Sequence, residues 1–300
     1  MSRRRADHAP RALVSVVTLG AAAGLLGVAA RAALHRQAAQ ARGAIGKPWG
    51  ETPTTPDANR VWRRRYGGTA LDLLVIGDSV AAGLGAEHRK DTLGGRLAKG
   101  LGKALRRPVR LTMAAVVGAE TSMVAAQLDG LPADYRPDVA VLVVGGNDVI
   151  HRVAVEESVA HLREVLERLR EAGVPTVVGT CPDLGAIRPV PQPLRALGAR
   201  VSRQLAAAQT RTAVDCGAHA VSLARVVGPF FLTDPEGMFS LDRFHPSAQG
   251  YRRTAAALVP SVLVALGEQQ AVPPGHHRPL TPGRASTVPR AERGEGGVVR

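Results

Sequence analysis

Short apolar runs alternate with longer amphipathic stretches along most of the chain. Five runs have the length expected of buried strands: Leu71–Ile76, Val109–Ala115, Asp138–Val144, Val174–Gly179 and His219–Leu223. From Val155 to Ala172, apolar residues recur every three or four positions, which predicts an amphipathic helix. A last helix is predicted at Ser247–Leu266. Strands that alternate with helices at this spacing predict a parallel α/β sheet with helices on both faces.

The two ends of the chain lack this alternation. The charge-free run at residues 12–30 follows an arginine-rich start and predicts a membrane anchor or signal-like helix within residues 1–42; a soluble, alanine-rich helix is the alternative. Residues 43–67 are rich in Pro, Gly and Thr and predict a linker. Residues 268–300 predict a disordered tail. The main domain is therefore expected at 68–267, exported or held at a membrane on its extracytoplasmic side, or alternatively on its cytoplasmic face.

Composition excludes some classes of function. The formal net charge is +14, but no nucleic-acid motif accompanies it and aromatic residues make up only 3% of the chain, so we expect no nucleic-acid partner. The two cysteines, Cys181 and Cys216, form no Cys-x-x-Cys pair, so no metal site is expected. They could form one disulfide or remain two free thiols. The sequence leaves the oligomeric state open.

Polar and glycine residues follow the predicted strands at the edge where parallel sheets bind ligands. Ser79 follows the first strand, Gly118 the second and Asn147 the third. Asp242 and His245 lie in the loop before the last helix. Each residue taken alone has a simpler explanation as a helix cap, a tight turn or a loop residue.

Taken together, these residues supply every group that acyl transfer needs. His245 can take a proton from Ser79, and Asp242 can orient the imidazole. The backbone amides of Ser79 and Gly118 and the side-chain amide of Asn147 can stabilise an oxyanion. Asp78 is expected to be structural, bonding the backbone near the turn.

The same residues resemble the four blocks of the GDSL, or SGNH, hydrolase family. The blocks are Gly77-Asp78-Ser79, the glycine Gly118 in VVGAETS, Gly145-Gly146-Asn147-Asp148, and Asp242-x-x-His245-Pro246. The resemblance spans residues 70–266. It implies a flavodoxin-like, three-layer α/β/α sandwich with about five parallel strands. It also implies hydrolysis of esters or thioesters without a metal or other cofactor, with Ser79 as nucleophile and Asn147 as oxyanion donor.

We therefore expect a serine esterase or lipase acting on a small-molecule, lipid or glycan ester. An acyl-thioesterase or lysophospholipase using the same site is an alternative, and an inactive membrane-tethered binding module is an alternative from another class. The α/β-hydrolase fold is disfavoured because Ser79 lacks the G-x-S-x-G pattern.

Three further stretches lie near the expected site. The loop Cys181–Arg200 follows the fourth strand and can form a wall or lid. Phe230, Phe231, Met238 and Phe239 can hold an acyl chain or simply pack the loop. His151 can lie at the mouth of the pocket, or it can be a solvated histidine at the start of a helix.

Overall fold

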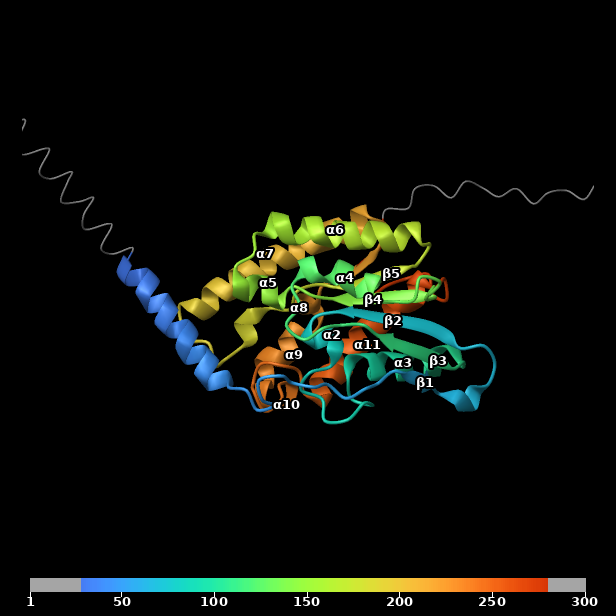
Figure 1. Ribbon diagram of the computed structural model, residues 1–300, viewed down its shortest axis with the longest axis horizontal. Coiled ribbons are helices and arrows are strands. Elements are labelled where there is room, and N and C mark those ends of the chain that lie inside the picture. The colour runs from blue at the N-terminus through green and yellow to red at the C-terminus, as the bar shows by residue number, and fades with distance from the viewer. Residues whose placement is uncertain (1–27, 280–300) are drawn as a thin grey trace, which may run out of the picture.

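The computed structural model describes residues 28–279, which form one mixed sheet with helices on both faces (Figure 1). The strands are β1 Arg60–Trp62, β2 Leu71–Gly77, β3 Val109–Met113, β4 Val139–Val143, β5 Thr176–Gly179, β6 His219–Val221 and β7 His276–His277. The helices are a first one at residues 28–45, α2 Ser79–Ala82, α3 Leu93–Leu105, α4 Val124–Asp129, α5 Gly146–His151, α6 Val155–Glu171, α7 Leu194–Asp215, α8 Leu223–Val226, α9 Gly228–Thr233, α10 Pro235–Met238 and α11 Ala248–Ala265. Short 3₁₀ turns lie at Arg64–Tyr66, Thr121–Met123 and Leu184–Ala186.

The five strands predicted from the apolar runs form the parallel centre of the sheet. Its order is β1-β3-β2-β4-β5-β6-β7, so the parallel strands, counted in chain order, follow the pattern 2-1-3-4-5. This is the flavodoxin-like order. In such sheets, ligands bind at the carboxyl ends of the strands, beside the first strand, where the order of the strands reverses. The predicted fold class is confirmed.

Helices cover the sheet in two layers. On one face, α3 and α11 pack over residues such as Leu73, Val75 and Val141; on the other, α4, α6 and α7 pack over Leu74, Ile76 and Leu142. The alternation follows from strand geometry, because successive side chains point to opposite faces. In β4 all five residues are buried, as a central parallel strand requires.

Two short strands extend the sheet beyond the predicted five. β1 pairs antiparallel with β3, and β7 pairs antiparallel with β6. β1 lies within residues 43–67, where the sequence predicts a linker, and β7 lies within residues 268–300, where it predicts disorder. Strands of three and two residues are too short to produce a periodic apolar pattern, and edge strands need none.

The helix at residues 28–45 begins at the first described residue, and residues 1–27 lie outside the described part of the chain. The apolar run at 12–30 falls mostly there, so the anchor or signal-like helix stays a prediction. Between residues 28 and 279, no helix combines the length and apolarity needed to cross a membrane. In Figure 1 the first helix projects at the end of the molecule where α7 begins, and its last turn lies nearest α10.

Candidate active site

Ser79 lies at the first position of a one-turn helix that follows the central strand β2. Asp78 caps this helix, and its Oδ1 accepts a hydrogen bond from Val80 N at 2.9 Å. Asp78 therefore has the structural role predicted for it. Gly77 has φ +131°, and a Cβ there would lie 1.9 Å from the carbonyl oxygen of Val143. The strand can thus turn sharply into the helix only because this position is glycine.

Ser79, His245 and Asp242 form a continuous chain of hydrogen bonds. His245 Nε2 lies 3.0 Å from Ser79 Oγ, and His245 Nδ1 lies 2.5 Å from Asp242 Oδ2. The bond to the carboxylate places the proton on Nδ1 and leaves Nε2 as an acceptor for the serine proton. The three residues that the sequence predicts to act together are therefore joined by hydrogen bonds in the structure.

The loop before α11 holds the carboxylate in place. Asp242 Oδ1 accepts hydrogen bonds from the backbone amides of Phe244 at 3.0 Å and His245 at 2.9 Å. Burial opposes the charge on Asp242, but the hydrogen bonds from His245 and these amides outweigh it and hold the pKa of this carboxyl below its ordinary value. Asp242 therefore remains charged beside the imidazole at neutral pH.

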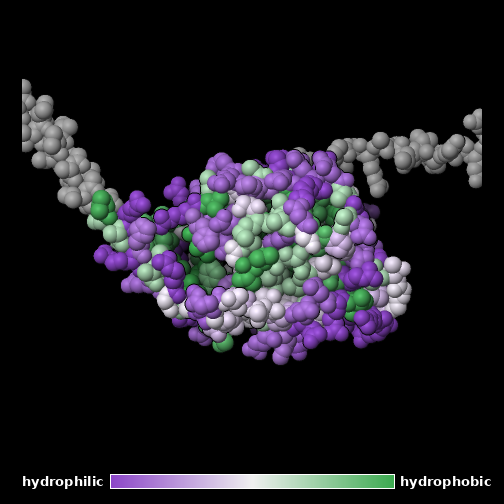
Figure 2. Space-filling view, in the orientation of Figure 1, coloured by the Kyte–Doolittle hydropathy of each residue, from purple (hydrophilic) through white to green (hydrophobic). Residues whose placement is uncertain are grey.

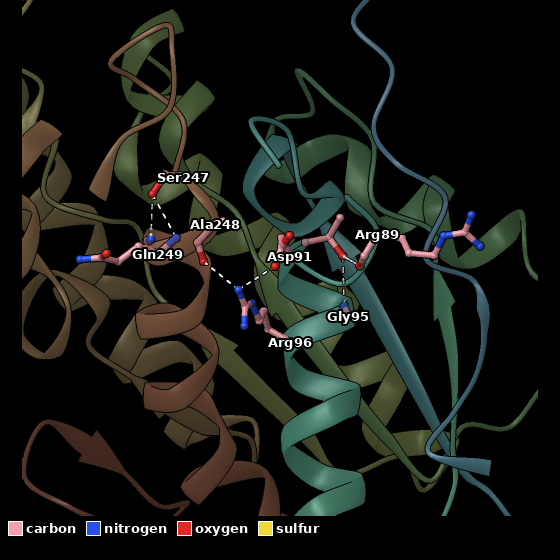
Figure 3. Close-up of polar contacts among 9 residues, drawn as sticks. Arg89, Asp91, Gly95, Arg96, Ser247, Ala248 and Gln249 are labelled. Atoms are coloured by element: carbon pink, nitrogen blue, oxygen red, sulfur yellow. Dashed lines mark hydrogen bonds and ion pairs between the residues drawn. The ribbon is translucent and has the colours of Figure 1, made fainter. Parts of the chain in front are cut away.

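The start of α11 fixes the end of this loop (Figure 3). Ser247 caps the helix, and its Oγ accepts hydrogen bonds from Gln249 N and Gly250 N. Arg96 on α3 donates to Asp91 Oδ1 at 2.6 Å and to the carbonyl of Ala248 at 3.5 Å. The helix that follows His245 is thus joined to the neighbouring helix of the same layer.

Asn147 and the Gly118 loop meet at the same edge of the sheet. The loop is joined to β2 by the hydrogen bond from Val116 N to the carbonyl of Gly77, at 3.1 Å. Asn147 Nδ2 donates to the carbonyl of Ala119 at 2.9 Å, which orients the amide beside Gly118. Gly118 has φ +85°, and a Cβ there would meet nothing within 4 Å. The backbone angle, rather than crowding within the protein, explains why this residue is glycine.

A second buried carboxylate supports this edge. Asp148 accepts hydrogen bonds from Thr121 N at 3.1 and 3.3 Å, which joins the Asn147 turn to the segment after Gly118. Burial, together with the charge of Asp148, raises the pKa of Asp78 to about 6, although hydrogen bonds from backbone amides lower it in part. Asp78 therefore carries a costly buried charge directly before the nucleophile.

An apolar cavity of ≈ 80 Å³ opens beside Ser79 and His245. Its apolar lining comes from several elements and consists of Val80, Val143, Pro182, Leu184, Ala186, Ile187, Leu223, Val227, Phe231, Phe239, Phe244 and Pro246. The loop after β5 thus forms one wall, as predicted. On the face shown in Figure 2, apolar residues also gather in a hollow beside the first helix.

The aromatic residues predicted near the site divide into two groups. Phe231 and Phe239 line the cavity and pack edge-to-face, with ring centroids 4.8 Å apart. Met238 is buried in the core, and Phe230 is partly exposed with the Arg253 guanidinium 4.4 Å above its ring. Two of the four therefore face the cavity.

His151 and the cysteines do not line the cavity beside Ser79. His151 is at the end of α5, and its Nδ1 lies 2.6 Å from Glu120 Oε1; it does not line the cavity. Cys181 and Cys216 are both buried free thiols in separate apolar clusters. Within residues 28–279, no group of three His, Cys, Asp or Glu side chains could hold a metal ion.

Sequence reasoning missed three residues near the site, two buried glutamines and one tryptophan. Gln127 is buried and makes two hydrogen bonds of 2.8 Å to the backbone of Gly77, one as donor and one as acceptor. Gln209 joins Cys181 N to the carbonyl of Val144 in the same way. A polar residue on the apolar face of a helix was the available signal. The third missed residue is Trp49, whose ring packs against the ring of His245.

Comparison with known proteins shows the family of the chain. The model of the GDSL-like lipase/acylhydrolase family matches residues 75–253. A GDSL-like esterase of Mycobacterium tuberculosis is 36% identical over 289 residues, covering 93% of this chain and 91% of the relative. The chain belongs to the GDSL-like lipase/acylhydrolase family. It is an ester-bond hydrolase.

Solved structures of a lipase and an esterase share the fold. A lipase from a goat rumen metagenome matches with a TM-score of 0.51 and 18% identity, over 65% of this chain and 97% of its own. The psychrotrophic esterase EstA of Pseudoalteromonas sp. matches with a TM-score of 0.51 and 17% identity, over 65% and 98%. At these identities the likeness concerns the fold alone.

Proposed function

We propose that this GDSL hydrolase cleaves carboxylic esters with Ser79 as nucleophile, His245 as general base and acid, and Asp242 as the orienting carboxylate. The observation that carries this proposal is the unbroken chain from Ser79 Oγ to His245 and on to Asp242. His245 Nε2 takes the serine proton as Oγ attacks the ester carbonyl, then returns it to the departing alcohol. Water then attacks the acyl-enzyme, with His245 again as base, and releases the acid.

The negative oxygen of each tetrahedral intermediate needs donors aimed at it. We assign this role to the backbone amides of Ser79 and Gly118 and to the side chain of Asn147. The Asn147 amide is oriented by Ala119, and the Gly118 loop is held to β2 next to the nucleophile. A neutral amide suits position 147, because a carboxylate would repel the developing charge.

The cavity beside Ser79 gives the acyl group a place to bind. It is apolar, and its volume leaves room for several carbon-sized groups. Phe231 and Phe239 close it with an edge-to-face pair. We therefore assign the cavity to the acyl chain and expect turnover to vary with chain length. Lipid, glycan and small-molecule esters all carry the group that this site cleaves.

Ser79→Ala tests the mechanism. We expect turnover of p-nitrophenyl esters from acetate to palmitate to fall by at least about 10⁴-fold, because the nucleophile is lost. Labelling by a fluorophosphonate probe should disappear at the same time. The matched control is Ser122→Ala, which removes an exposed serine near the same edge of the sheet and should keep both signals.

Full turnover by Ser79→Ala would contradict the nucleophile assignment. A folded wild-type chain that neither cleaves any of these esters nor reacts with the probe would favour the inactive binding module instead.

A further inference from the structure

An aromatic side chain from outside the family-matched region packs against the catalytic histidine. The ring centroids of Trp49 and His245 are 6.0 Å apart, with an angle of 69° between the rings. Phe244 also packs edge-on against His245, with centroids 4.8 Å apart, and it lines the apolar cavity. Trp49 does not line that cavity. It therefore contacts the histidine from outside the space that we assign to the acyl chain.

The local sequence builds a turn that presents this tryptophan. In Lys47-Pro48-Trp49-Gly50, the amide of Gly50 donates to the carbonyl of Lys47 at 2.9 Å, which closes a β-turn. Proline at the second position and glycine at the fourth are favoured in such turns. The Lys47 ammonium also pairs with Glu51, just after the turn. Trp49 is half-buried, so part of its ring remains open to a ligand.

The segment that carries the turn is joined to the catalytic loop before the turn and to the sheet after it. Arg243, between Asp242 and His245, donates to the carbonyl of Ala44 at 2.9 Å. After the turn, Asn59 Oδ1 accepts a hydrogen bond from Met113 N at 2.6 Å, next to β1. We call residues 46–59 the strap, since this stretch runs from the first helix to the sheet across the catalytic loop.

The first helix is itself attached to the loop that forms a wall of the cavity. Gln37 Nε2 donates to the carbonyl of Gln192 at 2.6 Å, and Gln37 Oε1 accepts from Leu194 N at 3.1 Å. Ala41, one turn further along, is buried. The helix and the strap thus contact both loops that border the site, which fixes the position of Trp49 relative to His245.

We propose that Trp49 is a specificity-determining residue that binds the alcohol part of the ester. The proposal rests on the proposed function, in which His245 Nε2 delivers its proton to the leaving alcohol. The alcohol leaves beside His245, and Trp49 packs against this histidine without lining the acyl cavity. An indole ring offers a broad apolar surface with a polar N–H at its edge. It suits an alcohol with an aromatic or long apolar body.

Four esters separate the two sides of the substrate. Ethyl and 2-phenylethyl esters of acetic and of hexanoic acid are compared in the full chain, with the released acid measured by pH-stat. We expect Trp49→Ala to raise KM for the 2-phenylethyl esters by about tenfold, as for loss of one apolar contact in a pocket. KM for the ethyl esters should change less than about twofold, and the effect should be the same for both acids. Trp49→Phe should restore most of the loss.

Trp62→Phe is the matched control, because Trp62 lies in β1 and its indole N–H donates to the carbonyl of Ala58 at 3.1 Å, away from the reacting atoms. It should keep wild-type KM values for all four esters. An equal loss on ethyl and 2-phenylethyl esters in Trp49→Ala would mean a structural role. A loss that grows with acyl length would place Trp49 on the acyl side. Either result would overturn the proposal.

A second readout does not depend on turnover. The chain has two tryptophans, so Trp62→Phe leaves Trp49 as the only one. We expect 2-phenylethanol, the product alcohol, to change the emission of Trp49 and to shield it from acrylamide quenching, whereas ethanol at the same concentration should not. The same response is expected with Ser79→Ala added. Failure of the serine mechanism would thus appear as turnover without Ser79, and failure of this proposal as an unresponsive Trp49.

Discussion

His245 is bound at both ring nitrogens and flanked by two aromatic rings. Asp242 fixes one nitrogen, Ser79 meets the other, and Phe244 and Trp49 pack edge-on against the imidazole. Such contacts restrict the ring to one orientation, and orientation is what a base needs for repeated proton transfer. Asp78, the residue before the nucleophile, differs from Asp242 because its pKa is raised and not lowered.

Asp78 makes the stability of the protein depend on pH. Because burial raises its pKa from 3.8 to about 6, the folded state binds more protons than the unfolded state between these values. The free energy of unfolding therefore falls as pH rises through this window and levels off above it. Asp78→Asn removes the effect. We expect the variant to gain about 3 kcal/mol relative to wild type between about pH 3 and pH 8.

Urea unfolding of both proteins across this pH range measures the difference. Asparagine still offers an oxygen to Val80 N, so the cap is retained in the variant. A difference between the two proteins that does not change with pH would show that Asp78 is not held at a raised pKa.

At the residue scale, the sequence predicts what short motifs encode. Ser79, Asp242 and His245 were predicted as a group, and the structure brings them into hydrogen-bond contact. Trp49 and Gln127 were not predicted, since each acts through a partner far away in the chain. A contact over almost two hundred residues, such as Trp49 with His245, leaves no local pattern.

At the junction of β2 and β4, the backbone of Gly77 lies too close to β4 to leave room for a side chain. A Cβ at Gly77 would overlap the Val143 carbonyl, and its φ of +131° is unfavourable for any other residue. We expect Gly77→Ala to lower the free energy of unfolding by about 4 kcal/mol, or to prevent folding, because the strands must separate. Chemical denaturation measures the loss.

Gly130→Ala is the control for this change. Gly130 follows α4, and a Cβ there would lie 3.6 Å from the nearest atom, which is an ordinary contact. Its cost should stay below about 1 kcal/mol. Similar effects of the two substitutions would contradict the close approach of β2 and β4.

Elements with a strong periodic pattern were predicted well, and short ones were not. The helix predicted at Val155–Ala172 is observed at Val155–Glu171, and the one predicted at Ser247–Leu266 at Ala248–Ala265. Each has a buried face that the apolar spacing reveals. β1 and β7 depend on pairing with neighbours that are distant in sequence, and that pairing is not visible in their own residues.

For the whole molecule, the two thiols report on global unfolding. Cys181 and Cys216 are 0% and 5% exposed, and burial raises the pKa of both thiols. The unprotonated thiolate, which is the reactive form, is thus scarce as well as inaccessible. We expect neither thiol to react with Ellman's reagent in the folded protein and both to react in denaturant. One rapidly reacting thiol in the folded state would contradict this packing.

The strap also affects how the enzyme is divided into domains. The family match begins at residue 75, so a catalytic domain defined by that match alone omits the tryptophan beside the histidine. A chain shortened to begin just before β2 would still carry Ser79, Asp242 and His245 but would lack the strap and with it Trp49. Related hydrolases that share the same catalytic residues can therefore differ in the alcohols they accept through a segment that the family model does not include.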